Sequence, residues 1–367
     1  SYIYDTQGKA YLDLVAGVSA CTLGHCHPKV VKAIQEQAAK YMHVMVYGEY
    51  AQSPAITYCK RLAENLPDPL ETTYLVNSGT EAIEGSIKLA KRATGRSQII
   101  AARKAYHGNT QGSLSIMDYE LRKQPFRPLL PDVAWIEFNN ESELEKITTR
   151  TAGVVLETIQ GGAGFITPEN DYLAKVKQRC QEVGALLILD EIQPGFGRTG
   201  KLFGFQNYNV VPDIIAIGKG MASGLPCGAF VASYELMHLL ADNPKMSHIT
   251  TFGGNPVVAA ASLATLNELL TTSLMQETLE KEQLFRKLLK HPKIKSVNGK
   301  GLMLAAIMES EQLANHIILY AHQRGYIFFW LLFELRAVRI SPPLTISKEE
   351  IEKACAIILE AIDHYKE

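Results

Sequence analysis

Two polar side chains that follow apolar runs carry the clearest chemical signal in this chain. Lys219 follows the run Asp213–Ile217 after one glycine, and Asp190 follows the run Ala185–Leu189. Each run has the length and composition of a buried strand. A carboxylate directly after five apolar residues is costly unless it is paired. The pattern therefore predicts that an amine and a carboxylate lie at the ends of two buried strands, where they are available to a ligand.

The segment Val76–Ala82 predicts the end of a strand and the start of a helix. Ser78 can cap that helix, and Glu81 can return the contact as a capping box. The free N–H groups at a helix start suit a phosphate, Gly79 lets the backbone approach closely, and Thr80 offers a second hydroxyl. Taken alone, an ordinary capped helix explains these residues equally well.

Together, these elements match the needs of pyridoxal 5'-phosphate. This cofactor requires a lysine for its aldehyde, a carboxylate for its pyridinium nitrogen and a site for its phosphate. Asp190 would keep the ring nitrogen protonated, and Lys219 could then move protons between substrate and cofactor carbons. The plainer alternatives are a surface lysine and an Asp190 that caps the next turn or pairs with an arginine such as Arg198.

Three side chains near these elements could contact the ring of such a cofactor. Tyr106 could stack on one face, Ile192 could pack on the other, and Gln193 could donate a hydrogen bond to the phenolic oxygen. An isolated loop tyrosine more often packs against the core. His107 is interpreted as a simple loop histidine, with no chemistry assigned.

Two later segments could bind anions. A glycine pair, Gly253-Gly254, precedes the helix start at Asn255-Pro256, and such a turn suits an anion. Arg339, beside the rigid Pro342-Pro343 turn, could hold a substrate carboxylate through two parallel hydrogen bonds. A loop-to-helix junction and a surface arginine are the plainer explanations.

The pattern of apolar segments predicts an α/β fold, with a mostly parallel central sheet covered by helices on both faces and a smaller α+β domain. The expected strands of the large sheet are Thr73–Asn77, Gln98–Ala102, Val133–Phe138, Gly153–Thr158, Ala185–Leu189, Asp213–Ile217 and Gly228–Ser233. An amphipathic helix is expected over Tyr172–Val183 and should stop at Gly184. Ser347 and Glu350 predict a capping box for a final helix.

We expect three parts along the chain. Residues 1–45 form an N-terminal segment of the small domain, and residues 46–255 form a large cofactor-binding domain. Residues 256–367 supply a connecting helix and the C-terminal small domain. A hairpin is expected within the first 14 residues, where Asp5–Lys9 separates two short apolar runs.

Composition limits the function classes. The 367 residues carry a net charge of −1, which gives no electrostatic footprint for nucleic acid or an anionic membrane. The six cysteines are scattered, so we expect a cytoplasmic protein rather than a disulfide framework. No apolar run reaches the length of a membrane span. His25-Cys26-His27 has no convincing partner cluster, so no metal site is expected. The chain begins with Ser1 rather than Met, which leaves a removed targeting segment open.

In this order, the elements resemble one family closely. The chain is similar to the class III pyridoxal-phosphate-dependent aminotransferases of fold type I, which include the ornithine, N-acetylornithine and 4-aminobutyrate enzymes. The resemblance extends from Tyr11–Asp13 and Leu23–Pro28 to Arg339–Leu344. Its most specific part is Leu187–Gly200, with Lys219 at the expected distance.

The resemblance implies a role for each site residue. Those implied for the cofactor are Ser78, Gly79 and Thr80 at the phosphate, Tyr106 and Ile192 on the ring faces, Asp190 at the pyridine nitrogen, Gln193 at the phenolic oxygen and Lys219 at the aldehyde. Thr251 would reach the phosphate bound by the neighbouring subunit, which implies a homodimer with shared active sites.

On the substrate side, the resemblance implies contacts from Arg339, Glu157 and Tyr47. Arg339 would bind a carboxylate of 2-oxoglutarate or of an α-amino substrate, Glu157 would line the site near the ring, and Tyr47 lies in a segment that would contact the substrate.

Two positions depart from the family pattern. Members that use both an ω-amine and glutamate usually carry Gln-Gly-Glu, whose glutamate pairs with the substrate-binding arginine. Here Gly162 stands in place of that glutamate, so Arg339 would lack an internal partner. N-acetylornithine enzymes typically carry His-Gly-Arg, and this chain has Asn109 at the position of that arginine. The departures weaken the usual dual-substrate switch and the N-acetylornithine assignment.

The expected activity is transfer of an amino group from an amino acid, such as N-acetylornithine, ornithine or 4-aminobutyrate, to 2-oxoglutarate. An aminomutase or racemase on the same scaffold would also keep Lys219 and Asp190 but would need no external oxo acid. A non-catalytic relative would have lost the lysine, the aspartate or the phosphate loop, and all three are intact.

Overall fold

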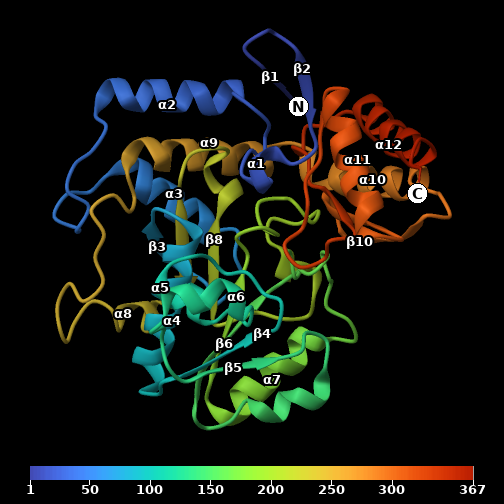
Figure 1. Cartoon of the computed structure of the whole chain (residues 1–367). Coiled ribbons are helices and arrows are strands. Elements are labelled where there is room, and N and C mark those ends of the chain that lie inside the picture. The colour runs from blue at the N-terminus through green and yellow to red at the C-terminus, as the bar shows by residue number, and fades with distance from the viewer. Residues whose placement is uncertain (367) are drawn as a thin grey trace.

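The computed structural model describes residues 1–366, and a mostly parallel sheet of seven strands forms its larger half (Figure 1). The strand order is β3-β9-β8-β7-β6-β4-β5. The strands are β3 (Thr72–Val76), β4 (Gln98–Ala102), β5 (Val133–Ile136), β6 (Thr151–Glu157), β7 (Leu186–Asp190), β8 (Ile214–Gly218) and β9 (Gly228–Ala232). Only β9 runs antiparallel to its two neighbours. The predicted α/β class and mostly parallel sheet are therefore confirmed.

Both faces of this sheet are buried, because side chains of one strand alternate between two apolar layers. Leu187 and Leu189 pack in one core cluster, and Ile188 between them packs in the other. Helix α7 (Tyr172–Val183) covers the first face, and α4 (Gly79–Thr94) covers the second. Strands buried on both faces are expected to be continuous apolar runs, and this explains their clear signal in the sequence.

The helix ends follow simple local rules. Helix α7 stops at Gly184, whose φ of 69° lies in the left-handed region that glycine tolerates best. Ser78 caps α4 by accepting from the N–H of Glu81 at 3.3 Å. The predicted reciprocal contact is wrong in detail, because Glu81 accepts from the N–H of Asn77, one residue earlier, at 2.7 Å. The capping box of Ser347 and Glu350 is confirmed.

The smaller half is built around an antiparallel sheet with the order β10-β11-β13. Its strands are β10 (Ile294–Lys300), β11 (Met303–Met308) and β13 (Ala337–Ile340), and its helices are α10 (Leu274–Leu288), α11 (Glu311–Gln323) and α12 (Lys348–Asp363). The predicted hairpin is β1 (Tyr2–Tyr4) with β2 (Ala10–Asp13), and β12 (Tyr326–Ile327) adds to it in parallel. The sequence patterns did not predict β10 or β12.

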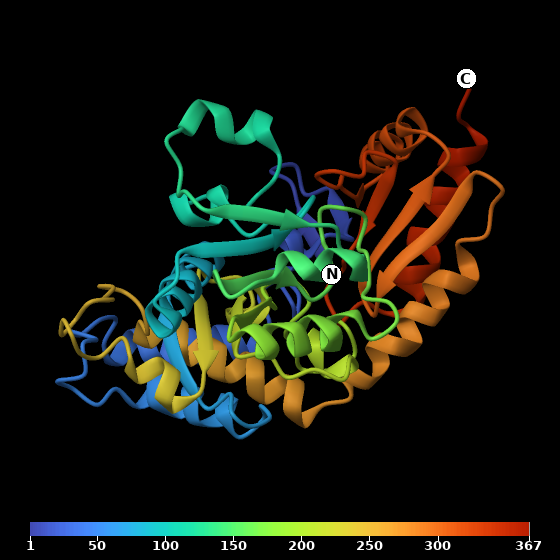
Figure 2. The same ribbon diagram turned by 90° about the horizontal axis from the view of Figure 1, so that it is seen from below.

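Long helices link the two halves. Helix α9 (Pro256–Thr271) lies against α2 (Pro28–Lys40) and α3 (Ser53–Ala63), and α10 continues from it towards the C-terminal half (Figure 2). No single helix within residues 1–366 is long and apolar enough to cross a bilayer. Only α9 and α10 together reach that length and composition, and they are bent by 71°.

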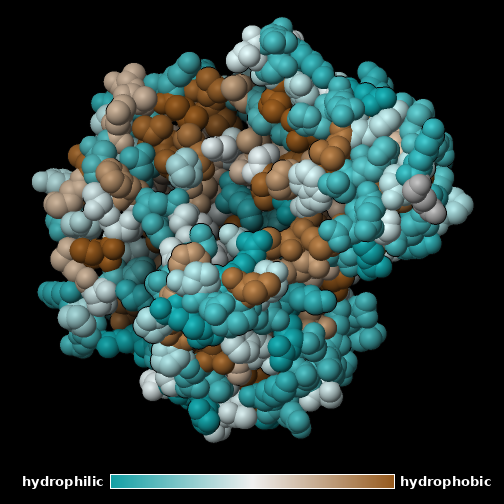
Figure 3. Space-filling model, viewed as in Figure 1, coloured by the Kyte–Doolittle hydropathy of each residue, from teal (hydrophilic) through white to brown (hydrophobic). Residues whose placement is uncertain are grey.

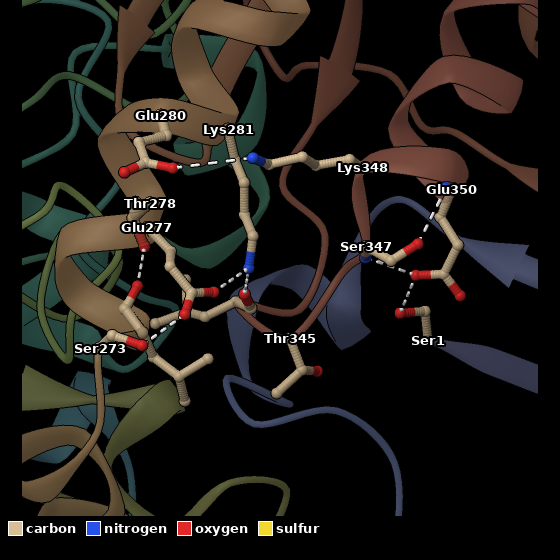
Figure 4. A network of polar contacts seen from close by, with 12 residues as sticks. Ser1, Ser273, Glu277, Thr278, Glu280, Lys281, Thr345, Ser347, Lys348 and Glu350 are labelled. Atoms are coloured by element: carbon tan, nitrogen blue, oxygen red, sulfur yellow. Dashed lines mark hydrogen bonds and ion pairs between the residues drawn. The ribbon is translucent and has the colours of Figure 1, made fainter.

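A polar network fastens the first residue of the chain to the C-terminal half (Figure 4). The hydroxyl of Ser1 donates to Glu350 at 2.9 Å, and Glu350 also accepts from the N–H of Ser347 at the start of α12. Lys281 on α10 donates to the carbonyl of Leu344 at 2.6 Å and pairs with Glu277 at 3.0 Å. The network joins α10, α12 and the N-terminus.

Short elements complete the described chain: α1 (Ala16–Ser19), α5 (Gln111–Ser115), α6 (Glu120–Lys123), α8 (Tyr234–His238), and the 3-10 turns Gln124–Phe126, Glu141–Lys146, Gly204–Asn207 and Lys219–Ala222. The predicted limits of the N-terminal segment and the two domains stay a prediction.

Candidate active site

Three ionisable side chains meet at the carboxyl ends of neighbouring strands of the large sheet. Glu157 ends β6, Asp190 ends β7, and the two residues pair in register. Lys219 directly follows β8, the next strand. The carboxyl ends of parallel strands in an open α/β sheet are where ligands bind. The fold therefore places these three groups in the usual position for an active site.

Asp190 is buried and held on both carboxylate oxygens. Its Oδ1 accepts from the N–H of Ile192 at 3.0 Å, and its Oδ2 contacts Nδ1 of His107 at 2.8 Å. Burial alone would lower the pKa of His107, but the hydrogen bond and charge of Asp190, together with Glu157, raise it overall. His107 therefore provides a donor that orients the carboxylate before any ligand binds.

His107 is the functional residue that the sequence analysis missed. Its ring is buried, and its Nε2 has no hydrogen-bond partner among the described residues. Because it lies 83 positions from Asp190, no local pattern reports the contact. Its position beside Tyr106, in the loop after β4, was the only available hint.

Glu157 is a second buried carboxylate that backbone groups hold in place. Its Oε1 accepts from the N–H of Gly161 at 2.9 Å, and its Oε2 accepts from the N–H of Tyr106 at 3.2 Å. Burial and, to a smaller extent, the charge of Asp190 raise the pKa of Glu157 to about 7, although His107 and the two backbone N–H groups act in the opposite direction. A neutral or half-ionised acid at this place can both accept and release a proton near neutral pH.

Lys219 is half-buried, and its side chain makes no hydrogen bond or ion pair within the described chain. Burial lowers the pKa of Lys219, the charge of Arg339 lowers it further, and Asp190 and Glu157 act against this. Its φ of 41° is unusual for a residue with a side chain, which indicates a backbone held by its surroundings. A lysine with a depressed pKa and no partner is suited to act as a nucleophile and proton carrier.

The start of α4 lies against the loop that carries Lys219. A Cβ on Gly218 would lie 3.3 Å from the Cα of Gly79, and a Cβ on Gly228 would lie 2.2 Å from the carbonyl oxygen of Ser78. The N–H groups of Gly79 and Thr80 donate to no group of the described residues, as expected for the first turn of a helix. They form a ready site for an anion.

Thr80 uses its hydroxyl within the protein. Its Oγ1 contacts the hydroxyls of Thr110 and Ser113, each at 2.7 Å, and accepts from the N–H of Asn109 at 3.2 Å. This network ties the loop after β4, which carries Tyr106, to the start of α4. At Thr80, the backbone N–H is therefore the group left for an anion.

The three side chains that were expected to contact the cofactor ring lie near these groups and differ in their exposure and contacts. Tyr106 is 40% exposed and is tied to Glu157 through its backbone. Ile192 is buried and fills the space beside Gly79, where a Cβ would lie 2.8 Å from its Cδ1. Gln193 lies beside Gly161 and donates to the hydroxyl of Ser19 at 3.3 Å.

Arg339 approaches from the smaller half. It lies on β13, is 9% exposed, and its guanidinium donates no hydrogen bond within the described residues, with Nε fully enclosed. Burial lowers the pKa of Arg339 to about 10, and no carboxylate acts against this. A buried cation without a partner is costly, so this position is stabilised when an anion arrives.

Thr251 and Tyr47 stand apart from this group in the single chain. Both are exposed, and Tyr47 lines a separate surface cavity of about 630 Å³ with Tyr74 and His248. Within residues 1–366, no group of three or more His, Cys, Asp or Glu side chains is arranged to hold a metal ion.

Comparison with known proteins identifies the family. The model of the class III aminotransferases matches residues 1–362. An acetylornithine aminotransferase from Methanopyrus kandleri is 35% identical over 98% of this chain and 92% of its own length. A putrescine aminotransferase from Pectobacterium atrosepticum is 38% identical over 98% of this chain and 79% of its own length.

A solved structure agrees with this finding. The ornithine aminotransferase from Toxoplasma gondii, described with partial occupancy of pyridoxal phosphate at its active site, superimposes with a TM-score of 0.90. It is 28% identical, and the match covers 98% of this chain and 88% of that one. The chain belongs to the class III aminotransferases, which depend on pyridoxal phosphate.

Proposed function

We propose that this aminotransferase moves an amino group from an amino acid donor to 2-oxoglutarate, with Lys219 and Asp190 as its catalytic residues. The observation that carries the proposal is the unpartnered Lys219, which lies with Asp190 at the carboxyl ends of the large sheet and beside the start of α4. Such an arrangement offers an amine, a ring partner and an anion site to one cofactor.

The residues present fit pyridoxal phosphate. The N–H groups of Gly79 and Thr80 are free for the phosphate, with the hydroxyl of Ser78 beside them. Asp190 is fixed by His107 and Ile192, and each oxygen keeps capacity for one more donor. Tyr106 and Ile192 would contact the ring faces, and Gln193 would donate to the phenolic oxygen.

The chemistry that pyridoxal phosphate supplies when bound is an aldehyde and an electron-withdrawing ring. Asp190 would keep the ring nitrogen protonated, and His107 holds Asp190 in its orientation. Lys219, with its lowered pKa, would carry a proton from the substrate carbon to the cofactor in the first half-reaction and from the cofactor to the substrate carbon in the second. Glu157 fixes the backbone around Tyr106 and Gly161.

Arg339 supports the choice of a carboxylate-bearing acceptor. Its enclosed guanidinium donates no hydrogen bond to any residue in the range 1–366, and its charge lowers the pKa of Lys219. An oxo acid bound there would gain a charge-assisted pair while its reacting carbon faces the lysine. The relatives named for acetylornithine, ornithine and putrescine support a donor with a terminal amine.

The proposal includes a homodimer with shared sites, in which Thr251 reaches the phosphate bound by the other subunit and Tyr47 reaches its substrate. Exposed apolar side chains support a dimer. An apolar cavity of about 430 Å³ opens beside α2 and α9, and its lining includes Ala38, Met42, Phe252, Val257 and Val258. Of these, Met42 and Phe252 are exposed in the single chain. Apolar residues also gather beside these helices in the space-filling view (Figure 3). Such surfaces mark protein contacts. Sedimentation at several concentrations tests for the dimer.

We further propose that residues 46–255 form a large domain that binds the cofactor and that the protein is cytoplasmic. Limited proteolysis with mass determination tests the first, and fractionation of the source cells tests the second.

One titration tests the transfer itself. Protein loaded with pyridoxal phosphate is followed by visible absorption while ornithine, N-acetylornithine or 4-aminobutyrate is added, and 2-oxoglutarate is then supplied. We expect one donor to remove the visible band and 2-oxoglutarate to restore it. Conversion of the donor without any oxo acid would indicate a mutase or racemase instead. No spectral response to any donor or oxo acid would contradict the proposed transfer.

A further inference from the structure

Element α1, residues 16–19, is a left-handed turn rather than an ordinary helix. The φ angles are 52° at Ala16, 59° at Gly17, 60° at Val18 and 66° at Ser19. Glycine tolerates this region, but residues with side chains normally adopt it one at a time, and a β-branched valine does so least readily. A costly backbone conformation that extends over several residues is typical of a functional element held by its surroundings.

Contacts from outside the turn hold α1 in this conformation. The buried carboxylate of Asp13 accepts from the N–H groups of Val15 at 2.8 Å and Ala16 at 2.9 Å. Ser341, directly after β13, donates its N–H to the carbonyl of Leu14 at 2.7 Å and its hydroxyl to the carbonyl of Val15 at 3.3 Å. The backbone of α1 is therefore fixed both by the segment before it and by the smaller half.

The turn lies at the active site, because α1 and the residues after it contact the 3-10 turn Lys219–Ala222. A Cβ on Gly220 would lie 2.3 Å from Oγ1 of Thr22. The hydroxyl of Ser223, at the end of the 3-10 turn, accepts from the N–H of Leu23 at 3.1 Å. A change in α1 is therefore close enough to affect the groups around Lys219.

The last residue of α1, Ser19, meets the side chain of Gln193. Ser19 is 2% exposed, and its Oγ accepts a hydrogen bond from Nε2 of Gln193 at 3.3 Å. Oε1 of Gln193 lies beside Gly161, where an added Cβ would be 2.9 Å from it. An amide nitrogen carries two hydrogens, and the second one donates to no group of the described residues. Ser19 therefore orients the amide of Gln193 and leaves one N–H free.

We propose that Ser19 is a positioning residue, held by the left-handed turn, that keeps the free N–H of Gln193 available to the phenolic oxygen of pyridoxal phosphate. The inference rests on the proposed function, in which Gln193 donates to that oxygen. Without the hydroxyl of Ser19, the amide can rotate about its last bond and the donor is no longer held. The donor stabilises the negative charge that stays on the oxygen when the bound cofactor loses a proton, so it lowers the pH at which that proton is lost.

The experiment is a pH titration of the visible absorption band of protein loaded with pyridoxal phosphate, without substrate. The midpoint of the band change is compared between wild type and Ser19→Ala. We expect the midpoint to rise by about 0.5 pH units or more in the variant, because a hydrogen bond to a charged oxygen is weakened. An unchanged midpoint would overturn the inference.

Ser19→Gly separates the hydroxyl from the backbone. It also lacks the hydroxyl, but glycine suits a φ of 66°, so this variant should fold even if Ser19→Ala is destabilised. We expect the same rise of the midpoint in both variants. A rise in Ser19→Ala alone would assign the effect to the backbone and refute the positioning role.

A double substitution shows whether Ser19 acts through Gln193. Gln193→Ala should raise the midpoint at least as much as Ser19→Ala does, and the two substitutions together should raise it little further. If Ser19→Ala shifts the midpoint equally with and without the Gln193 side chain, Ser19 does not act through the amide and the inference fails.

Thr22 supplies the matched control. It is a second buried hydroxyl in the same segment, and this hydroxyl has no hydrogen-bond partner in the described part of the chain. Thr22→Val keeps the shape and should keep the wild-type midpoint. A shift as large as that of Ser19→Ala would show that any disturbance of the segment moves the midpoint, which contradicts the specific contact proposed.

The outcomes separate this inference from the proposed transfer. If Ser19→Ala moves the midpoint through Gln193 but no donor reacts, the positioning role stands and the transfer fails. If donors react but the midpoint is the same in all variants, the transfer stands and the positioning role fails.

Discussion

The two ends of the active site differ in how their charges are compensated. At the sheet end, Asp190 and Glu157 are each held on both oxygens by protein donors. At the opposite end, Arg339 is as deeply buried but has no partner within residues 1–366. The comparison indicates that the carboxylates are oriented by the fold, whereas the guanidinium is complete only when a ligand binds.

This difference follows from where the charges lie in the fold. Asp190 and Glu157 end neighbouring strands, so loops that leave the same sheet edge supply their donors. Arg339 enters from a separate sheet, and burial is the only cause that shifts its pKa. Groups that are oriented in advance favour the transition state, and a charge left open favours ligand binding. The four predictions below separate these roles.

The largest effect is expected at Lys219, which directly follows β8 at the sheet end. Lys219→Ala removes the nucleophile and the proton carrier, so kcat should fall by at least about 10⁴-fold. Turnover and the visible absorption of the loaded protein measure this. Lys201→Ala, an exposed lysine, is the matched control and should retain both. Turnover within tenfold of wild type in Lys219→Ala would refute the assignment.

The next effect breaks the sheet end. Asp190→Asn keeps the shape but removes the charge that holds a proton on the ring nitrogen, and it weakens the contact with His107. We expect kcat to fall by roughly 10²–10³-fold, the usual loss for one oriented electrostatic group, with a smaller change in KM. Steady-state kinetics at saturating cofactor measures this. An increase in KM without a fall in kcat would indicate that Asp190 contributes to substrate binding rather than to the chemical step.

The sheet end was also the part that the sequence predicted best. Lys219, Asp190 and the Ser78–Thr80 turn were found because each follows a continuous apolar run, and such runs are the direct signature of strands buried on both faces. The limits of the strands were within about two residues because turns and glycines mark them. The edge strand β10, which is polar and partly exposed, lacks that signature and was missed.

The contacts that decide the chemistry lie between segments far apart in the chain. His107 and Asp190 are 83 positions apart, and Ser19 and Gln193 are 174 positions apart. The sequence predicted a cofactor contact for Gln193, but not that Ser19 orients its amide. Local periodicity predicts which face of an element is buried and carries no information on which distant side chain covers it.

A third effect concerns Arg339, whose substitution should weaken ligand binding but stabilise the fold. Arg339→Met removes a buried cation, so KM for 2-oxoglutarate should rise by roughly 10–10²-fold with a smaller change in kcat. The free energy of unfolding of the unliganded protein should rise by about 1 kcal/mol or more, because the variant no longer buries an unpaired charge. Kinetics and denaturant unfolding without substrate measure both. A destabilised variant would show that Arg339 already has a compensating partner.

The last effect concerns Glu157 and is a dependence of stability on pH. Burial raises its pKa from 4.5 to about 7, so the folded protein keeps a proton that the unfolded chain releases. The associated stability is complete below about pH 4.5 and is lost as pH rises to about 7, by about 3 kcal/mol at most. Glu157→Gln has no carboxyl group to titrate, so its unfolding free energy should rise relative to that of the wild type between pH 5 and pH 7.5.

Glu280, an exposed glutamate on α10, is the matched control for this titration. Glu280→Gln should change the unfolding free energy little, because the side chain is 66% exposed and its ion pair with Lys348 lies at the surface. If Glu157→Gln also follows the wild-type curve, the backbone N–H groups of Gly161 and Tyr106 stabilise the carboxylate enough to offset its burial. Glu157 would then carry a negative charge near neutral pH, and the two ends of the site would differ more in charge.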